Sequence, residues 1–324
     1  MSGGLIGVIG AGAFGTALAV VLAREGRAVA LYARDGAQVA AMRATRRNDS
    51  RLAGVDLPPG LAVTDDLVAL DAAETLLLTV PTQKLGAFLA GQAVRLDGRR
   101  LVACCKGVDL ATLDGPVAMI ARACPVAVPA VLTGPSFAAD IARGLPTALT
   151  LACADDAVGR AMQHQLSTAT LRLYRTPDTL GAELGGALKN VVAIAAGVAI
   201  GAGLGDSARA ALMTRGYAEM LRLAVHLGAQ GETLAGLSGF GDLVLTCTSA
   251  QSRNFRYGQS LGAGQGFDPA VTVEGAATAR AVTRLAAERG IDMPIAAMVA
   301  ALIEGRIALS DAVTALLSRP LKQE

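Results

Sequence analysis

The sequence has no tryptophan and only two histidines and five cysteines in 324 residues, and each scarcity narrows its chemistry. The cysteines are odd in number and none shows C-x-x-C spacing, which favours reduced core thiols in a cytoplasmic protein over disulfides or metal ligands. With two histidines available, we expect no metal site.

Charge of one sign and long hydrophobic runs are scarce as well. The net charge is +2, which argues against a nucleic-acid partner. The one basic cluster, "RATRRNDSR" at 43–51, is either a solvated loop or a phosphate contact. The longest uncharged apolar run, 191–205, is shorter than the ~20 residues of a membrane span. We therefore expect neither a transmembrane segment nor a signal peptide.

Lysine is also rare, because only four of the 29 basic residues are lysines. Two of these, Lys106 and Lys189, sit beside glycines in apolar surroundings. Arginine stays protonated in proteins, whereas a desolvated lysine can lose its proton. The two lysines are therefore candidates for proton transfer.

The order of apolar runs predicts two kinds of architecture in one chain. Up to residue 177, short β-branched runs alternate with amphipathic stretches, which is typical of a parallel sheet covered on both faces. After Pro177 the patterns are helical. We predict an α/β domain over 1–177, followed by an all-helical domain over 178–324. The predicted strands are 5–9, 28–32, 75–80, 100–105, 126–132, 147–152 and 170–174. The predicted helices of the second part are 178–202, 206–227, 231–236, 270–289, 294–304 and 309–317.

A glycine-rich turn follows the first predicted strand. In "LIGVIGAGAFGTALA", Gly10 allows a tight turn, Gly12 lets the backbone approach a pyrophosphate, and Gly15 lets helix pack on strand. The unpaired N–H groups of the following helix, from Ala13 onward, then face the phosphates. This context predicts dinucleotide binding in a doubly wound, Rossmann-type domain.

The second strand ends in "LYARDG", where NAD-specific proteins usually carry an acid. Arg34 stands there instead, which favours the 2′-phosphate of NADPH over NADH, although a surface arginine is the alternative. Lys106 directly follows another strand, at the sheet edge where ligands bind. In "LTGPSFAAD", Ser136 either caps a helix or faces a ligand.

The most informative stretch is "ELGGALKNVVAIAAG", an apolar helix with Lys189 and Asn190 at its centre. Burial can bring the pKa of a lysine toward neutrality, which suits general acid–base catalysis. The neighbouring Gly185 and Gly186 would leave room for a substrate. Asp242, an isolated acid in an apolar run, is the expected counter-ion.

Polar groups near the end of the chain suit an anionic ligand. "QSRN" offers Ser252, Arg253 and Asn254, a composition suited to a phosphate or carboxylate. Glu274 is an isolated acid that either reaches the site or caps the next helix.

With these motifs together, the chain resembles the bacterial NAD(P)-dependent glycerol-3-phosphate dehydrogenases. The resemblance runs through "GAGAFGTALA", "VPTQ", "KGVD", "GPSFA", "ELGGALKNVVAIAAG", "GFGDLVLTCTS", "QSRNFRYG" and "LLSRP". It implies a fold similar to 6-phosphogluconate dehydrogenase and hydride transfer between NAD(P)H and dihydroxyacetone phosphate. It also implies a product, sn-glycerol 3-phosphate, and a homodimer.

The resemblance also implies residue roles. Lys189 would be the acid/base, Asp242 its neighbour, and Lys106 a contact of substrate and cofactor. Arg253 and Asn254 would receive the phosphate end of the substrate. The remaining cofactor positions are Phe14, Arg34, Ala138 and Glu274, and the remaining substrate positions are Gly134 and Ser136. The loop "RLAG" at 51–54 departs from the family's "YLPG", so we expect an aromatic contact beside the cofactor to be lost.

Two other classes remain open. A ketopantoate reductase or β-hydroxyacid dehydrogenase would share the fingerprint and a central lysine, but not "SRN" beside "GFGDLVLTC". A non-catalytic NADPH-sensing protein would have little reason to bury a lysine and an aspartate.

Overall fold

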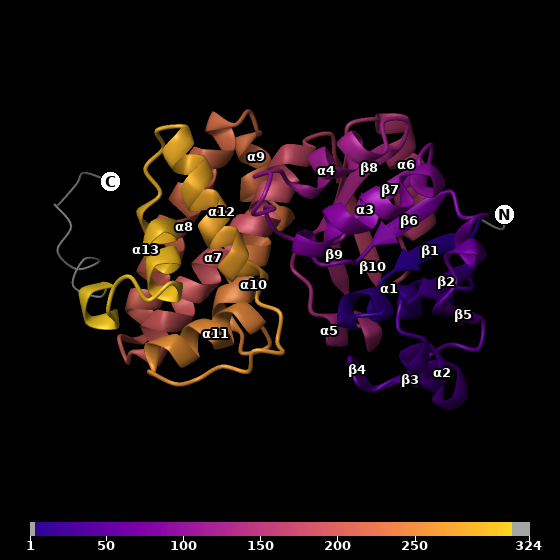
Figure 1. Ribbon diagram of the computed structural model, residues 1–324, viewed down its shortest axis with the longest axis horizontal. Helices are drawn as coiled ribbons and strands as arrows, with labels where there is room; N and C mark the ends of the chain where they lie inside the picture. Colours follow the sequence, from indigo (N-terminus) through magenta and orange to yellow (C-terminus); the bar gives the residue numbers. More distant parts are fainter. Residues whose placement is uncertain (1–3, 313–324) are drawn as a thin grey trace.

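The structure is a computed structural model that describes residues 4–312. Figure 1 shows two halves side by side, with the sheet in one and a helical assembly in the other. Elements up to β10 belong to the half with the sheet, and elements from α7 onward to the helical half.

One eight-stranded sheet forms the centre of the α/β half, in the order β10-β9-β8-β7-β6-β1-β2-β5. Its strands are β1 Ile6–Ile9, β2 Val29–Tyr32, β5 Leu61–Thr64, β6 Thr75–Leu78, β7 Arg100–Ala103, β8 Val128–Thr133, β9 Thr147–Cys153 and β10 Leu171–Thr176. All seven predicted strands are present. Strand β5, at the edge, was not predicted.

The sheet is parallel, as predicted, except at one edge. β9 runs antiparallel to β8, and β10 runs parallel to β9, so these two strands oppose the other six. A parallel crossover needs a dozen or more residues, usually with a helix that spans the sheet. The connection from β8 to β9, residues 134–146, is long enough for a crossover, but its helix α5, Ala138–Ala142, has only five residues and cannot span the sheet, and the chain returns in the opposite direction.

Helices cover both faces of the sheet (Figure 1). Besides α5 they are α1 Ala13–Arg24, α2 Gly36–Thr45, the 3₁₀ helix η1 Leu67–Leu70, α3 Thr82–Leu96, α4 Pro116–Ala123 and α6 Asp156–Leu166. A small hairpin, β3 Arg47–Asn48 with β4 Leu52–Asp56, pairs outside the main sheet. This hairpin was not predicted either.

The second half is helical throughout the described residues. It consists of α7 Thr179–Gly201, α8 Gly205–His226, α9 Gly231–Ala235, the π-helix η2 Leu237–Gly241, α10 Asp242–Thr248, α11 Arg253–Gly262, α12 Glu274–Glu288 and α13 Pro294–Ile303. The sequence did not predict η2, α10 or α11. The predicted helix 309–317 lies mostly outside the described residues.

Helix α7 is the axis of this half, and it is buried from Gly181 to Ala199. Where α11 crosses α7, glycines allow the backbones of the two helices to touch. A Cβ on Gly197 would lie 2.1 Å from the carbonyl oxygen of Phe255, and one on Gly258 would lie 2.1 Å from that of Ile194. In the described part of the chain, α7 is the single helix long and apolar enough to cross a membrane, but 89% of its apolar window is buried inside the protein.

Candidate active site

The buried lysine of α7 has its expected partner. The Nζ atom of Lys189 lies 2.8 Å from Oδ1 of Asp242 and donates to Oγ1 of Thr246 at 2.5 Å. The Thr246 hydroxyl in turn donates to Oδ1 of Asp242 at 3.2 Å. Lys189 is 6% exposed and Asp242 1%, so both charges are compensated by contact with each other instead of with water.

A second lysine binds the same carboxylate. Lys106, in the loop after β7, lies 2.5 Å from Oδ2 of Asp242 through its Nζ atom, and it donates to the carbonyl oxygen of Gly134 at 3.2 Å. Asp242 therefore joins two ammonium groups, one from each half of the molecule. The sequence predicted the pair with Lys189 but not the one with Lys106.

This arrangement shifts the pKa of both partners. Burial and the charge of Lys106 lower the pKa of Lys189 to about 8, against the opposing effect of Asp242. Burial alone would raise the pKa of Asp242, but the two lysines hold it below its ordinary value. Asp242 is therefore ionised at neutral pH, while Lys189 can gain or lose a proton near pH 8.

The glycines beside Lys189 bring other elements close, which corrects the expectation that they leave room for a ligand. A Cβ on Gly185 would lie 2.8 Å from the carbonyl oxygen of Ser238 in η2. A Cβ on Gly186 would lie 2.6 Å from Oγ1 of Thr133, at the end of β8. The glycines thus allow η2 and the sheet to approach α7, and this approach places Asp242 between the lysines.

Two asparagines meet beside this cluster. The side-chain nitrogen of Asn254 donates to Oδ1 of Asn190 at 2.9 Å, and its oxygen accepts from the backbone N–H of Gly275 at 3.0 Å. Ser252 is buried and caps α11 by accepting from the N–H of Phe255. Its neighbour Arg253 is exposed in the first turn of α11, where the helix dipole adds to its positive charge.

The glycine-rich turn has the shape that a pyrophosphate requires. Gly10 has φ +116°, and a Cβ on Gly15 would lie 2.1 Å from the carbonyl oxygen of Gly10, so both positions require glycine. At Gly12 a Cβ would meet nothing within 4 Å, so the missing side chain leaves open space before α1. Helix α1 begins at Ala13 without a side-chain cap, so its N–H groups are available to an anion. These residues fit a dinucleotide.

Comparison with known proteins identifies the family. Residues 5–159 match the N-terminal model of NAD-dependent glycerol-3-phosphate dehydrogenase, and residues 178–314 match the C-terminal model. The chain belongs to this family. A glycerol-3-phosphate dehydrogenase [NAD(P)+] of Cereibacter sphaeroides is 68% identical over 99% of this chain and 100% of its own length. One of Paracoccus denitrificans is 65% identical over 98% of this chain and 99% of its own.

A solved structure agrees. The glycerol-3-phosphate dehydrogenase of Coxiella burnetii has a TM-score of 0.92 at 35% identity, with 98% of this chain and 100% of that chain covered. Membership in the family makes this chain an NAD(P)-dependent oxidoreductase. It also decides against the ketopantoate reductase, β-hydroxyacid dehydrogenase and sensor alternatives.

Within this dehydrogenase fold, the residues after β2 divide their roles. Asp35 caps α2, since its carboxylate accepts from the N–H groups of Ala37 and Gln38. Arg34 is exposed at the end of β2. Asp35, the acid nearest to the end of β2, is therefore engaged as a helix cap, and Arg34 gives this end of the strand a positive charge.

The alternatives for Ser136 and Glu274 are settled in part. Ser136 does not cap α5, whose N-cap is Phe137, and its hydroxyl instead donates to the carbonyl oxygen of Gly134 at 3.2 Å. Glu274 is the first residue of α12, which has no side-chain cap. Burial raises the pKa of Glu274, an effect that Arg253 opposes, so Glu274 lies within the electrostatic reach of the site. The partly buried Phe14 and Ala138 begin α1 and α5.

Thr246 is the site residue that the sequence analysis missed. It lies four residues after Asp242 on α10, a spacing that places two side chains on the same face of a helix. The signal was available, but the sequence did not predict that this stretch is helical.

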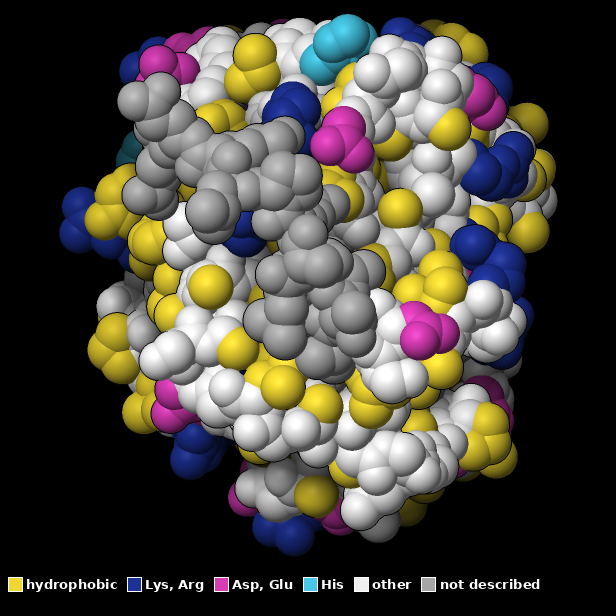
Figure 2. All heavy atoms as spheres, turned by 90° about the vertical axis from the view of Figure 1, so that its left-hand side faces the viewer, with side chains coloured by type: hydrophobic (Ala, Val, Ile, Leu, Met, Phe, Trp, Pro, Cys, Tyr) yellow, Lys and Arg dark blue, Asp and Glu magenta, His cyan; other side chains and the backbone are white. Residues whose placement is uncertain are grey.

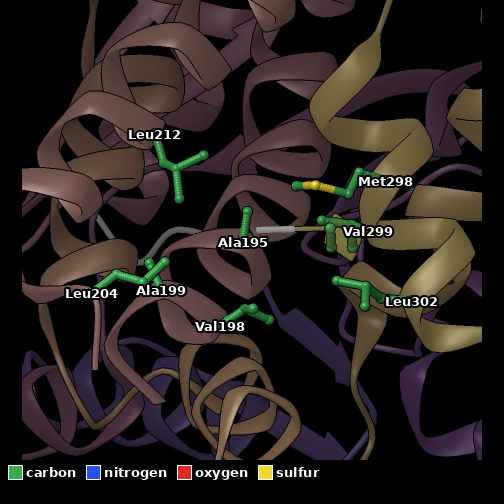
Figure 3. Close-up of a pocket in the computed structure, with 9 residues that line it drawn as sticks. Ala195, Val198, Ala199, Leu204, Leu212, Met298, Val299 and Leu302 are labelled. Carbon is green, nitrogen blue, oxygen red and sulfur yellow. The ribbon is translucent and has the colours of Figure 1, made fainter. Parts of the chain in front are cut away.

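An apolar pocket lies apart from this cluster, between α7, α8 and α13 (Figure 3). Its wall is hydrocarbon with one thioether, from Ala195, Val198, Ala199, Leu204, Leu212, Met298, Val299, Leu302 and Ala312. Hydride transfer to a phosphorylated ketone needs charged and hydrogen-bonding groups, so this pocket is not the reaction site. In the part of the chain that the structure describes, no group of three His, Cys, Asp or Glu side chains could hold a metal.

Proposed function

We propose that this dehydrogenase interconverts dihydroxyacetone phosphate and sn-glycerol 3-phosphate, for glycerophospholipid synthesis, with Lys189 as the general acid and base. The observation that carries the proposal is a buried ammonium with a pKa of about 8, held by an ionised carboxylate where the two halves meet. Such a group changes its protonation state within the pH range in which proteins work.

In the reductive direction, Lys189 donates its proton to the ketone oxygen, and the carbonyl carbon becomes a C–H. The reduced nicotinamide, when bound, supplies the hydride for that carbon. Asp242 and Thr246 hold the Nζ atom of Lys189 in place by hydrogen bonds of 2.8 and 2.5 Å. In the oxidative direction, the neutral amine of Lys189 accepts the hydroxyl proton.

Lys106 is the third member of the catalytic cluster in this proposal, in contact with both substrate and cofactor. Its link to Asp242 and to the carbonyl oxygen of Gly134 supports a place at the ligand-binding edge of the sheet. Ser136 shares that carbonyl oxygen, which supports its assignment, with Gly134, to the substrate side.

The phosphate end of the substrate is assigned to the start of α11. Arg253 supplies a fork of donors and Asn254 an amide that Asn190 and Gly275 already orient. Ser252 belongs to the same turn, although its hydroxyl caps the helix. Anchoring this end fixes the orientation of the ketone and so lowers the barrier by several kcal/mol.

The cofactor is assigned to the turn between β1 and α1, and to the further residues that the family resemblance implies. The assigned residues are Gly10, Gly12, Ala13, Phe14, Gly15, Arg34, Lys106, Ala138, Arg253 and Glu274. Either NADH or NADPH serves, and the exposed guanidinium of Arg34 favours NADPH.

Three further assignments complete the proposal. The chain divides into a dinucleotide-binding domain, 1–177, and a catalytic domain, 178–324, as the change of secondary structure after β10 supports. A cytoplasmic location is supported by five free, buried cysteines. A homodimer rests on the family resemblance. On the face of the helical half drawn in Figure 2, the apolar side chains of the described residues are interspersed with charged ones.

A direct assay tests the proposal. Loss of NADPH absorbance should occur with dihydroxyacetone phosphate and not with ketopantoate or without a second substrate. Turnover of ketopantoate at a higher kcat/KM than dihydroxyacetone phosphate would refute the substrate assignment.

A further inference from the structure

The hairpin β3–β4 contributes no strand to the main sheet, yet one of its side chains is among the most buried polar groups of the α/β half. Asn48 is 3% exposed. It belongs to the basic cluster 43–51, which the proposed function leaves unused. What this residue contacts is the turn that precedes α1.

All four hydrogen-bonding positions of the Asn48 side chain are engaged. Its nitrogen donates to the carbonyl oxygen of Ala11 at 3.0 Å and to Oγ1 of Thr16 at 2.7 Å. Its oxygen accepts from Nε2 of Gln38 at 3.1 Å and from the hydroxyl of Ser50 at 3.4 Å. A buried amide so fully satisfied holds one orientation.

The carbonyl of Ala11 accepts a second amide, because Nε2 of Gln38 donates to it at 2.9 Å. Two donors, one from α2 and one from β3, therefore hold this carbonyl on one side of the glycine-rich turn. In a trans peptide the C=O and the following N–H point in opposite directions. The N–H of Gly12 is consequently turned away from the two donors that hold the Ala11 carbonyl.

We propose that Asn48 is a positioning residue for nucleotide binding, which presets the peptide between Ala11 and Gly12 for the pyrophosphate. The inference rests on the proposed function, in which the turn between β1 and α1 holds the dinucleotide. Because the pyrophosphate is common to NADH and NADPH, Asn48 supports both cofactors equally. Arg34 differs in this respect, since a guanidinium near the 2′-phosphate favours NADPH alone.

Three of the four arginines in the basic cluster have structural contacts. Arg47 pairs with Asp56 across the hairpin at 2.7 Å. The side chain of Arg46 donates to carbonyl oxygens of the segment 57–61. Arg43 donates to the carbonyl oxygen of Val63. Arg43 and Arg46 thus tie α2 and its C-terminal end to the segment 57–63 that follows the hairpin, and Arg47 links the two strands of the hairpin itself. The hairpin and α2 lie next to each other in Figure 1.

The test is the dissociation constant of each nucleotide, measured by fluorescence titration of the intact protein. Asn48→Asp is nearly isosteric but removes both N–H donors and sets a carboxylate oxygen against the Ala11 carbonyl. We expect its Kd for NADH and for NADPH to rise together, on the order of tenfold, the cost of one lost buried hydrogen bond. At saturating nucleotide, kcat and the KM for dihydroxyacetone phosphate should match the wild type.

Two further variants separate positioning from general destabilisation. Arg47→Gln breaks the exposed ion pair of the same hairpin without touching the turn, and its Kd values should equal those of the wild type. Gln38→Met removes the other donor to Ala11, from a less buried position, and should weaken both nucleotides by a smaller factor. It serves as the test if Asn48→Asp does not fold.

The outcomes distinguish the two proposals. If the wild type binds neither nucleotide, the proposed function fails. If the wild type binds both and Asn48→Asp, or Gln38→Met in its place, binds them as tightly, the positioning role alone is refuted. Weakening of NADPH without NADH would also refute it, because the effect would then concern the 2′-phosphate.

Discussion

The Nζ atom of Lys189 lies 2.8 Å from Oδ1 of Asp242, a contact that joins the middle of α7 to the first residue of α10. Neither charge could be buried alone without a large desolvation cost. Together they leave the amine with a pKa of about 8, so its proton is available for transfer.

The two directions of the reaction should respond oppositely to pH. Reduction of dihydroxyacetone phosphate needs the ammonium form of Lys189, so its kcat should fall as the pH rises through about 8. Oxidation of glycerol 3-phosphate needs the neutral amine, so its kcat should rise over the same range. Steady-state rates in both directions across this range provide the measurement. Identical pH profiles in the two directions would contradict the role of Lys189.

Removal of the Lys189 amine should greatly reduce turnover and leave nucleotide binding unchanged. Lys189→Met keeps the volume and leaves Asp242 paired with Lys106, so we expect a folded protein with kcat reduced by roughly 10²–10⁴-fold. The Kd for NADPH should not change. Lys84→Met, at an exposed position on α3, is the matched control and should retain wild-type kcat. A Lys189→Met variant that keeps a large share of wild-type turnover would exclude this lysine as the acid.

Gly185, four residues before Lys189 on α7, should tolerate no side chain. In Gly185→Ala the new methyl would lie 2.8 Å from the carbonyl oxygen of Ser238 and 3.0 Å from Cα of Gly239, and both contacts are with backbone. The π-helix η2 must then move, and Asp242 follows it. We expect a loss of about 1–3 kcal/mol in the free energy of unfolding, with a lower kcat.

A second helical glycine provides the control for that variant. Gly91 of α3 is exposed and a Cβ there meets nothing within 4 Å, so Gly91→Ala should stabilise the protein by up to ~1 kcal/mol. Urea denaturation and kcat measure both variants. Equal behaviour of the two would show that close packing at Gly185 does not position Asp242.

Cofactor choice should depend on Arg34. Because Asp35 is engaged as the cap of α2, Arg34 is the charged side chain left to meet a 2′-phosphate. In Arg34→Ala we expect kcat/KM with NADPH to fall about tenfold, the equivalent of 1.4 kcal/mol, while the value with NADH stays unchanged. Measurement of kcat/KM with each nucleotide for both proteins gives the answer. An equal loss of kcat/KM with NADH and NADPH would show that Arg34 does not bind the 2′-phosphate.

Much of this could be predicted from local patterns. The turn at Gly10 follows from glycine spacing between a strand and a helix, and the pair of Lys189 with Asp242 follows from two isolated charges in apolar runs. The contact of Lys106 with the same carboxylate could not be predicted. It depends on the approach of β8 and η2 to α7. Glycines allow this approach, but their positions in the sequence do not show which elements will meet there. The reversal of β9 likewise depends on where the short helix α5 packs, and Asn48 reaches the turn through a hairpin too short to give a periodic signal.

A buried carboxyl that takes no part in the chemistry should make stability depend on pH. Glu183, near the start of α7, is 7% exposed and accepts from the N–H of Val117 at 2.7 Å, in the first turn of α4. Burial raises its pKa to about 7, an effect that the Val117 N–H opposes and the charge of Asp114 reinforces. The folded protein therefore holds a proton that the unfolded chain has already released.

The sign of the pH dependence follows from that difference. An unfolded glutamic acid has a pKa of about 4.3, so the stabilising effect of the bound proton is complete below that pH and is lost as the pH rises to about 7. The full loss is at most about 4 kcal/mol. Glu183→Gln keeps an oxygen that accepts from Val117 but cannot ionise, so its free energy of unfolding should vary less between about pH 5 and pH 8. Urea denaturation at both pH values, with the exposed Glu25→Gln as control, measures the difference. If Glu183→Gln and the wild type lose stability equally over this range, Glu183 is not the group that titrates.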